Sequence, residues 1–348
     1  MKEKIKKILA IAVNAPSGDN SQPWKFKLLD NGLEVFNQPQ ADDTQYNFHQ
    51  RGSLLAHGAL LENVCLLAET EGLKPTITLF PNGTNSNLTA RVLFEAFQPA
   101  KKNWAEIIEL RATNRKAYKS QHLAKEFCDQ IQSLNQTGKI KVLLNQEPRD
   151  IERLAKALSY NEKLILENPF IHREIFKFIR WSKQAMQKTK DGHDIKSLEL
   201  EPPQEMAFKV FSHWPILKFL NRFHVSKLVT NETEKVYRSS ACYGLITAPD
   251  LEPITLIQAG RLFEKIWLTA TQSGVNLQPT TALLYLNQRV TEQQADKLTP
   301  EQINIVKTAN KVITEVFRAH EQPLMLFRMG YCQPPTARSL KKPPLYLP

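Results

Sequence analysis

The sequence predicts an α+β fold made of two related halves, each with a sheet of antiparallel or mixed strands flanked by helices. Segments with helical periodicity alternate along the chain with short runs of strand-forming residues. An Asn31-Gly32 pair between two such runs indicates a β-hairpin. Two long apolar helices, expected over 51–71 and 256–273, share a pattern of residues, which indicates an internal repeat.

The repeat is seen at an offset of 202 residues, the difference between the positions of Gly58 and Gly260. Glu62 then matches Glu264, and alternate apolar positions match as well. A proline and a Thr-rich strand follow each helix. Many helices share leucines at core positions, so a chance match stays open. The shared glycines, and the proline and strand that follow both helices, favour a repeat.

The first half is expected to span residues 1–104. It begins with an amphipathic helix over 5–13, which ends before Pro16 because proline has no N–H to donate. Gly72 suits the C-cap of the first long helix. The other elements expected in this half are strands at 25–29, 33–36, 76–80 and 90–97.

The second half is expected to span residues 105–348 and to carry an insert at about 184–238. The insert is polar at first and then rich in aromatic residues. Long inserts in compact domains are often functional, so a lid is favoured over a partner surface or a membrane-facing segment. The regular elements expected here are helices at 103–110, 125–134, 148–166 and 170–183, with strands at 139–144 and 323–331.

Composition narrows the class of protein. The chain has 348 residues, of which 42% are hydrophobic and 23% charged, as in soluble globular proteins. The formal net charge of +11 would suit nucleic acid, an anionic membrane or phosphate-bearing small molecules. Lysine and arginine are scattered and form no consecutive run, which favours a basic surface with a few phosphate-binding cations. A nucleic-acid binder is the weaker alternative.

The cysteines and histidines predict neither a disulfide framework nor a metal site. The four cysteines lie far apart, with no C-x-x-C pair, as expected of thiols in a reducing compartment such as the cytoplasm. The eight histidines lack the spacing of metal ligands. The basic and apolar N-terminus imitates a signal peptide, but its apolar run of six residues is too short. No run is long enough to span a bilayer, so no membrane partner is expected.

The loop from Pro16 to Trp24 is made almost wholly of small and polar residues. It offers backbone N–H groups, a hydroxyl at Ser17 and amides at Asn20 and Gln22, which suit a flat, polar, partly anionic ligand. A plain helix-to-strand connection is the alternative. The pattern P-S-x-x-N-S-Q-P-W after an N-terminal helix resembles the FMN-contacting loop of the nitroreductase family.

A second segment also resembles that family. Its R-x-[ST]-x-R signature, which recognises the FMN phosphate and the edge of the ring, matches the run from Arg111 to Arg115, with Thr113 in place of the more usual serine. Nitroreductases are typically homodimers whose FMN sites draw residues from both chains. Here each half carries one signature, so the resemblance implies a single-chain pseudo-dimer with one complete site, which could be monomeric.

The resemblance implies the cofactor-binding residues. Arg111 and Arg115 would bind the phosphate, since arginine offers a bidentate fork to it. The family's C-terminal basic pair would correspond to Arg338 and either Lys341 or Lys342, although a solvated tail is the alternative. Gln278 lies where the family approaches the ring. The full set expected to bind FMN is Pro16, Ser17, Asn20, Gln22, Arg111, Thr113, Arg115, Gln278, Arg338 and Lys341.

Most of the chain resembles the tandem, Acg-like branch of the family, in which the insert can act as a lid and some members do not bind FMN. The function this implies is an FMN-dependent oxidoreductase that takes hydride from NAD(P)H and reduces a small nitroaromatic, quinone or similar acceptor. The flavin performs the chemistry, so no catalytic residue is expected. The alternative is a catalytically silent protein of this fold that sequesters flavin or binds a partner.

Overall fold

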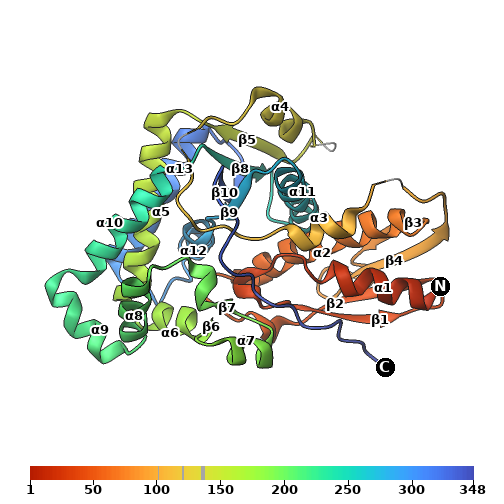
Figure 1. Cartoon of the computed structure of the whole chain (residues 1–348), viewed down its shortest axis with the longest axis horizontal. Coiled ribbons are helices and arrows are strands. Elements are labelled where there is room, and N and C mark those ends of the chain that lie inside the picture. Colours follow the sequence, from red (N-terminus) through yellow and green to blue (C-terminus); the bar gives the residue numbers. More distant parts are fainter. Residues whose placement is uncertain (101, 120, 135–137) are drawn as a thin grey trace.

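Two four-stranded antiparallel sheets organise the chain (Figure 1). The computed structural model describes residues 1–100, 102–119, 121–134 and 138–348. The first sheet has the strand order β1-β2-β4-β3 and the second the order β5-β8-β10-β9. The α+β class and the antiparallel sheets predicted from the sequence are confirmed.

The first sheet is built from consecutive segments of the N-terminal part. The Asn31-Gly32 turn joins β1 to β2 as expected, and the backbone N–H of Leu29 donates to the carbonyl of Gly32 at 2.9 Å. The long helix α2 lies between β2 and β3 in the sequence. The elements are α1 (Lys2–Ala12), β1 (Trp24–Leu28), β2 (Gly32–Asn37), α2 (Arg51–Thr70), β3 (Leu73–Leu79) and β4 (Leu88–Ala96).

The second sheet repeats the order of the first. If the strands of each sheet are numbered along the chain, both read first, second, fourth, third, and a long helix follows the second strand in both. The elements are β5 (Lys141–Asn145), β8 (Cys242–Ala248), α11 (Pro253–Gln272), β9 (Asn276–Pro279) and β10 (Gln322–Gly330). The topology of the two halves is therefore the same.

The two long helices pack against each other at the centre of the molecule. A Cβ on Gly58 would lie 2.1 Å from the carbonyl oxygen of Ile257, and one on Gly260 would lie 2.0 Å from that of Leu55. Only glycine allows such close approach of two backbones. Residues of both sheets and both helices share one hydrophobic core around this crossing, including Phe26 and Trp267.

The second half differs from the first in its connections. A short turn joins β1 to β2, whereas residues 146–241 separate β5 from its neighbour β8. Helices also separate β9 from β10. The helices that pack around the second sheet are α4 (Lys125–Ser133), α5 (Pro148–Glu167), α12 (Ala282–Thr291) and α13 (Pro300–Phe317), whereas α3 (Trp104–Leu110) packs against α1, α2 and α11.

The segment after α5 corrects one predicted element. The helix expected over 170–183 ends at Lys177, and residues 179–180 form a short strand that pairs in parallel with residues 193–194. Asp191 anchors this turn through an ion pair with Arg180. The elements here are α6 (Pro169–Lys177), β6 (Ile179–Arg180), α7 (Lys183–Thr189), β7 (His193–Asp194), α8 (Pro202–Phe211), α9 (Trp214–Leu220) and α10 (Val225–Arg238).

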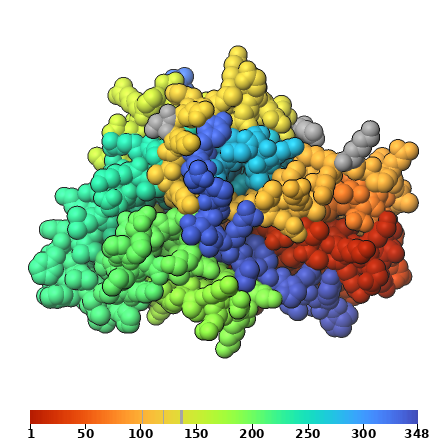
Figure 2. All heavy atoms as spheres, viewed as in Figure 1, coloured from red at the N-terminus to blue at the C-terminus, as the bar shows by residue number. Residues whose placement is uncertain are grey.

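The C-terminal segment returns to the first half. After β10 it crosses the surface between the green insert and the red N-terminal part (Figure 2). Tyr346 forms a parallel bridge with Phe26 in β1. The carbonyl of Leu345 accepts a hydrogen bond from the N–H of Phe26 at 2.9 Å. The end of the chain therefore lies along the edge of the first sheet (Figure 1).

Candidate functional site

A cavity of about 760 Å³ lies where the first half, the second half and the insert meet. Three segments far apart in the sequence contribute predicted residues to its wall: the loop after α1, the segment after α3, and β9. The predicted residues that line the cavity are Pro16, Ser17, Thr113, Arg115 and Gln278.

Pairing with β9 places the segment after α3 at the cavity. Thr113 forms a parallel bridge with Leu277, and the N–H of Asn114 donates to the carbonyl of Leu277 at 3.2 Å. The Asn114 amide also donates to the side chain of Asn276 at 2.9 Å. These contacts bring Thr113 and Arg115 next to Gln278, although more than 160 residues separate them in the sequence.

The loop after α1 has an unusual backbone. Asp19, Asn20 and Gln22 have positive φ angles of 47°, 54° and 55°, a region that few residues other than glycine adopt. The hydroxyl of Ser17 accepts a hydrogen bond from the N–H of Gln22 at 3.0 Å, which closes the turn. A Cβ on Gly18 would lie 2.9 Å from the Asp42 carboxylate, so a larger residue here would displace that side chain.

Asn20 and Gln22 do not line the cavity; their amides bind other parts of the chain. Asn20 donates to the carbonyl of Leu340 at 2.9 Å. Gln22 donates to the carbonyl of Lys190 at 2.8 Å and accepts from the N–H of Lys342 at 2.7 Å. Asn20 therefore ties the C-terminal segment to the loop, and Gln22 ties both that segment and the insert to it.

Lys341 lies on the other side of the same loop. Its ammonium donates to the carbonyl of Ala15 at 2.8 Å and to the Asn20 side chain at 2.7 Å. Burial, with a smaller contribution from Arg111, lowers its pKa to about 7. Arg338 donates to the carbonyl of Glu109 at 2.6 Å. Neither predicted cation of the C-terminal segment lines the cavity.

Arg111 is buried behind the cavity. It donates to the carbonyl of Asn14, lies 4.4 Å from the centre of the Trp267 ring, and its Nε is 3.3 Å from a carboxylate oxygen of Glu264. Burial raises the pKa of Glu264 to about 7, and Arg111 opposes that rise. Arg111 therefore neutralises a buried carboxylate in the core.

Arg115 supplies the positive charge at the cavity. Among the described residues of the wall it is the only lysine or arginine. It donates one hydrogen bond, to the carbonyl of Ser197 at 3.0 Å, and burial lowers its pKa. Beside it, Nε2 of His193 lies 3.1 Å from the Asp19 carboxylate. Burial lowers the pKa of His193, and the hydrogen bond to Asp19 opposes this.

Gln278 is fixed by a residue that is not predicted from the sequence. Nε of Arg328, in β10, donates to the Gln278 side chain at 2.7 Å. Arg328 is fully buried and also donates to the carbonyls of Lys116 and Val236. Its guanidinium lies 4.0 Å from the centre of the Tyr118 ring. A buried, fully bonded arginine of this kind holds its neighbours in place.

Four of the five carboxylates in the wall are not predicted, and the fifth, Asp19, belongs to the predicted loop. Asp42 accepts from the Thr44 hydroxyl at 2.9 Å, and burial together with Asp19 raises its pKa to about 6. Burial raises the pKa of Glu162, on α5, to about 7. Single polar residues within helices and loops carry no motif, so no signal in the sequence distinguishes them. The acidic residues of the wall are Asp19, Asp42, Glu162, Glu199 and Glu232.

The insert forms much of the wall. Helices α8 and α10 contribute apolar side chains, and His193 and Glu199 come from the segment between α7 and α8. The insert predicted at about 184–238 thus contributes to the wall, and its action as a lid stays a prediction. Apolar residues of the insert that line the cavity are Leu198, Leu200, Ala207, Phe208, Phe211, Val225, Leu228, Val229 and Val236.

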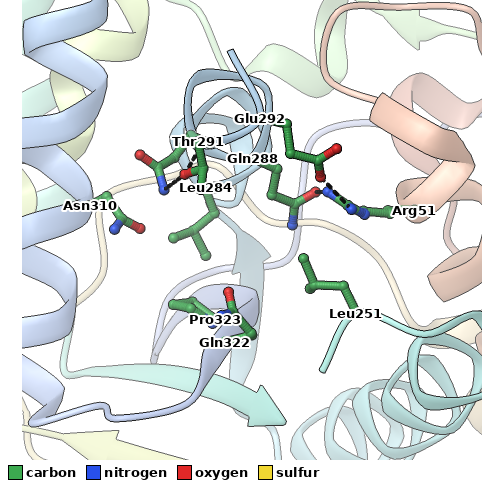
Figure 3. A pocket seen from close by; sticks show the side chains of 10 residues that line it. Arg51, Leu251, Leu284, Gln288, Thr291, Glu292, Asn310, Gln322 and Pro323 are labelled. Atoms are coloured by element: carbon green, nitrogen blue, oxygen red, sulfur yellow. Dashed lines mark hydrogen bonds and ion pairs between the residues drawn. The ribbon is translucent and has the colours of Figure 1, made fainter. Parts of the chain in front are cut away.

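A second cavity of about 50 Å³ lies between α2, α12 and β10 (Figure 3). Arg51 reaches across it to Glu292 at 2.7 Å and to Gln288 at 3.3 Å. A space of this size holds one or two water molecules. It contains none of the residues predicted to bind a cofactor.

Comparisons with known proteins give distant similarity over nearly the whole chain. No protein-family model matches. The chain is 21% identical over 334 residues to the uncharacterised protein MT1398 of Mycobacterium tuberculosis, covering 95% of this chain and 46% of that protein. It thus spans about half the length of that relative. It is 22% identical over 352 residues to a protein of the same species provisionally named NAD(P)H nitroreductase Rv3131, covering 97% of this chain and 89% of the relative.

Two solved structures were also matched. One is a nitroreductase with bound FMN from Bacteroides fragilis, with a TM-score of 0.37 and 9% identity over 70% of this chain and 95% of that one. The other is the FMN-dependent nitroreductase NfnB of Mycobacterium smegmatis in complex with NADPH. Its TM-score is 0.37 and its identity 13%, covering 69% of this chain and 96% of that one.

Proposed function

We propose that the chain is an FMN-dependent oxidoreductase of the nitroreductase type, which takes electrons from NAD(P)H and reduces a small oxidised acceptor. One observation carries the proposal: the loop after α1, the segment Arg111–Arg115 and Gln278, which the resemblance assigns to FMN, meet at one cavity. The similarity to a provisionally named NAD(P)H nitroreductase over 97% of this chain supports it.

The wall of the cavity fits a flavin in four respects. Its volume of about 760 Å³ lies within the roughly 300–1,000 Å³ of ligand pockets. Arg115 can bind an anionic group with charge-assisted hydrogen bonds. The hydroxyl of Thr280, in the wall, is buried and has no partner among the described residues, so a ligand could supply one. Trp267 and Tyr285 add aromatic surface.

FMN, when bound, would supply hydride and electron transfer between the two substrates. The residues of this chain would bind and orient it. Arg115 would bind the phosphate, and the hydroxyls of Ser17 and Thr113 would bind its polar groups. Arg328 would keep Gln278 in place at the site. The apolar side chains of α8 and α10 would exclude water from the cavity.

Asn20, Gln22, Arg338 and Lys341 have a different role in this proposal. The hydrogen bonds of Asn20, Gln22 and Lys341 hold the C-terminal segment against the loop, and that of Arg338 holds it against the end of α3, so they would support the site without touching the cofactor. Arg111 would act in the core in the same indirect way. The phosphate would then depend on Arg115 alone among the predicted cations.

The proposal includes two further points: the chain contains an internal duplication, and it acts as a monomer. The common strand order and the reciprocal packing of Gly58 and Gly260 support a single chain that folds like a dimer. The cavity lies between the halves, as a site at a dimer interface would. A chain that contains both halves needs no second copy to complete this site.

A catalytically silent flavin-binding protein is the second candidate. It is favoured by the insert that covers the cavity, by five carboxylates in the wall, and by the internal bonds of Arg111, Arg338 and Lys341. Such a protein would hold flavin, or keep the cavity closed, without turnover.

A spectroscopic experiment separates the two. The purified chain is incubated with FMN, desalted, and its visible spectrum is recorded without oxygen before and after addition of NADH or NADPH. The oxidoreductase retains the flavin band, which bleaches with NAD(P)H and returns when a quinone or nitroaromatic is added. A band that does not bleach supports the silent protein, and the absence of a band contradicts both.

A further inference from the structure

The tip of the insert carries an exposed apolar surface formed by α8, α9, the turn at 221–223 and α10. Met206, Phe219, Phe223 and Leu228 expose 71%, 54%, 65% and 63% of their surface. The rings of Phe219 and Phe223 lie 5.6 Å apart, so they form one patch. We call this surface the tip patch; its members are Met206, Val210, Ile216, Phe219, Phe223 and Leu228, all exposed. Large exposed apolar patches mark interaction sites.

The charges within the segment that carries the tip patch are basic, and the flanking carboxylates are Glu205, which pairs with Lys209 at 3.1 Å, and Glu232, which pairs with Lys235 at 2.6 Å. Residues 206–231 contain no aspartate or glutamate, but they contain three lysines and one arginine. Lys218, Arg222 and Lys227 are exposed, and none forms an ion pair with another described residue. The guanidinium of Arg222 lies 5.9 Å from the centre of the Phe219 ring, so charge and apolar surface are next to each other. The basic residues are Lys209, Lys218, Arg222 and Lys227.

The helices divide into two faces. On α8, Met206 and Val210 are exposed, whereas Ala207, Phe208 and Phe211 line the cavity. The exposed residues of the tip patch are therefore distinct from the apolar residues that the insert turns toward the cavity. In Figure 1, α8 and α9 lie at the end of the molecule opposite the first sheet, which leaves the patch free to meet a large flat surface.

We propose that the tip patch docks the protein on the surface of a membrane that contains anionic lipids. Helices with aromatic and aliphatic residues on one face and lysine or arginine beside them lie in the headgroup region of bilayers. Anionic headgroups attract the basic residues, and lysine stems extend along apolar surface while their charges stay in water. Phenylalanine, methionine and arginine are also common at protein interfaces, but lysine is depleted there, so the exposed Lys218 and Lys227 favour a bilayer over a protein partner.

This mode of binding is compatible with the rest of the structure. No helix in the described part of the chain is long and apolar enough to cross a membrane. Surface docking needs no such helix, so the sequence-based expectation of no membrane partner, which rests on the lack of a spanning run, does not exclude it.

The cavity wall and the tip patch share one residue. Leu228 is both a member of the tip patch and part of the cavity wall. A docked protein would therefore face the bilayer with the part of the insert that covers the cavity. Docking itself does not depend on flavin binding or on the proposed redox activity, so its test is separate from theirs.

The test is co-sedimentation of the full chain with vesicles of phosphatidylcholine alone or with added phosphatidylglycerol. We expect binding to the anionic vesicles, and weakening of that binding as salt is raised. The double variant Phe219→Ser/Phe223→Ser should bind about tenfold or more weakly, because two exposed rings are lost. Both side chains are exposed, so the variant should fold, which its circular dichroism and Tm would check.

Two controls separate the patch from general effects. Phe97→Ser removes a ring that is 60% exposed in the first half, and should leave binding unchanged. Lys218→Glu/Lys227→Glu should weaken binding, whereas Lys27→Glu/Lys74→Glu, with the same change of net charge on the first sheet, should weaken it much less. Failure to bind either vesicle, or equal effects of patch and control variants, would overturn the proposal. So would a wild-type dimer in solution that the phenylalanine variant abolishes.

Discussion

Gly58 and Gly260 face each other where α2 and α11 cross: a Cβ on Gly58 would lie 2.8 Å from the Cα of Gly260. Each glycine also meets a carbonyl three residues before the other glycine, that of Ile257 for Gly58 and that of Leu55 for Gly260. The contact therefore has the reciprocity of an interface between identical subunits. It lies at the boundary of two halves with the same strand order.

The crossing predicts the effect of adding one methyl group. Gly58→Ala and Gly260→Ala should each destabilise the fold by about 3 kcal/mol or more, because backbone must move to admit the Cβ. The two variants should cost similar amounts, since the contacts are reciprocal. Chemical denaturation would measure this.

Gly52→Ala on α2 is the matched control. The nearest atom to its Cβ would be the side-chain oxygen of Asn47, at 3.1 Å, and no backbone atom lies that close. Its cost should be clearly smaller than that of Gly58→Ala. Equal losses at Gly52 and Gly58 would contradict the account of the crossing.

Asn20 should control the accessibility of the C-terminal segment. Asn20→Ala removes the bond to the carbonyl of Leu340 and one bond to Lys341. Loss of a hydrogen bond should raise local opening about tenfold, and trypsin would then cleave faster after Arg338 and Lys341. Asn287→Ala, on α12, should leave the cleavage rate unchanged. An unchanged rate for Asn20→Ala would contradict its role in holding the tail.

Arg328 should be important for stability because it connects three parts of the chain. Lysine cannot make its bonds to Gln278, Lys116 and Val236 at once, so Arg328→Lys should cost about 2–4 kcal/mol. Arg149→Lys on the surface of α5 should cost little. A drop in Tm for Arg328→Lys no greater than for Arg149→Lys would show that Arg328 does not fix this region.

Glu162 should make stability depend on pH. Burial raises its pKa from 4.5 to about 7. The folded state thus favours the protonated carboxyl. The resulting contribution to the free energy of unfolding is complete below about pH 4.5 and is lost as the pH rises through 7. Glu162→Gln should remove that loss, on the order of 2 kcal/mol, so its Tm should fall less between pH 5 and pH 8 than that of the wild type. Glu126→Gln, at an exposed site on α4, should follow the wild type.

The sequence predicts much of the first half because its elements are local. Periodicity, the Asn31-Gly32 turn and the glycine at the end of α2 are signals within a few residues. β8 is not predicted, because all seven of its residues are buried and no alternation marks it as a strand. α12 and α13 are also not predicted. The turn after α6 depends on pairing with residues 193–194, which periodicity in 170–183 does not show.

The sequence identifies the segments that form the site, but not the orientation of their side chains. The polar loop and the Arg111–Arg115 segment can be identified from residue types, but the sequence does not say where each side chain points. Asn20 turns toward Leu340, 320 residues away, and Arg111 turns into the core. The carboxylates of Asp42 and Glu162 meet the cavity only because the whole chain folds around it.

The most direct test of the proposed function is a titration of the purified chain with FMN, followed by the quenching of flavin fluorescence. The account predicts saturable binding of one FMN per chain. Arg115→Ala should weaken that binding by about tenfold or more, because a charge-assisted bond to phosphate is lost. Arg149→Ala should bind as the wild type does. Absence of saturable binding, or equal affinities for wild type and Arg115→Ala, would contradict it.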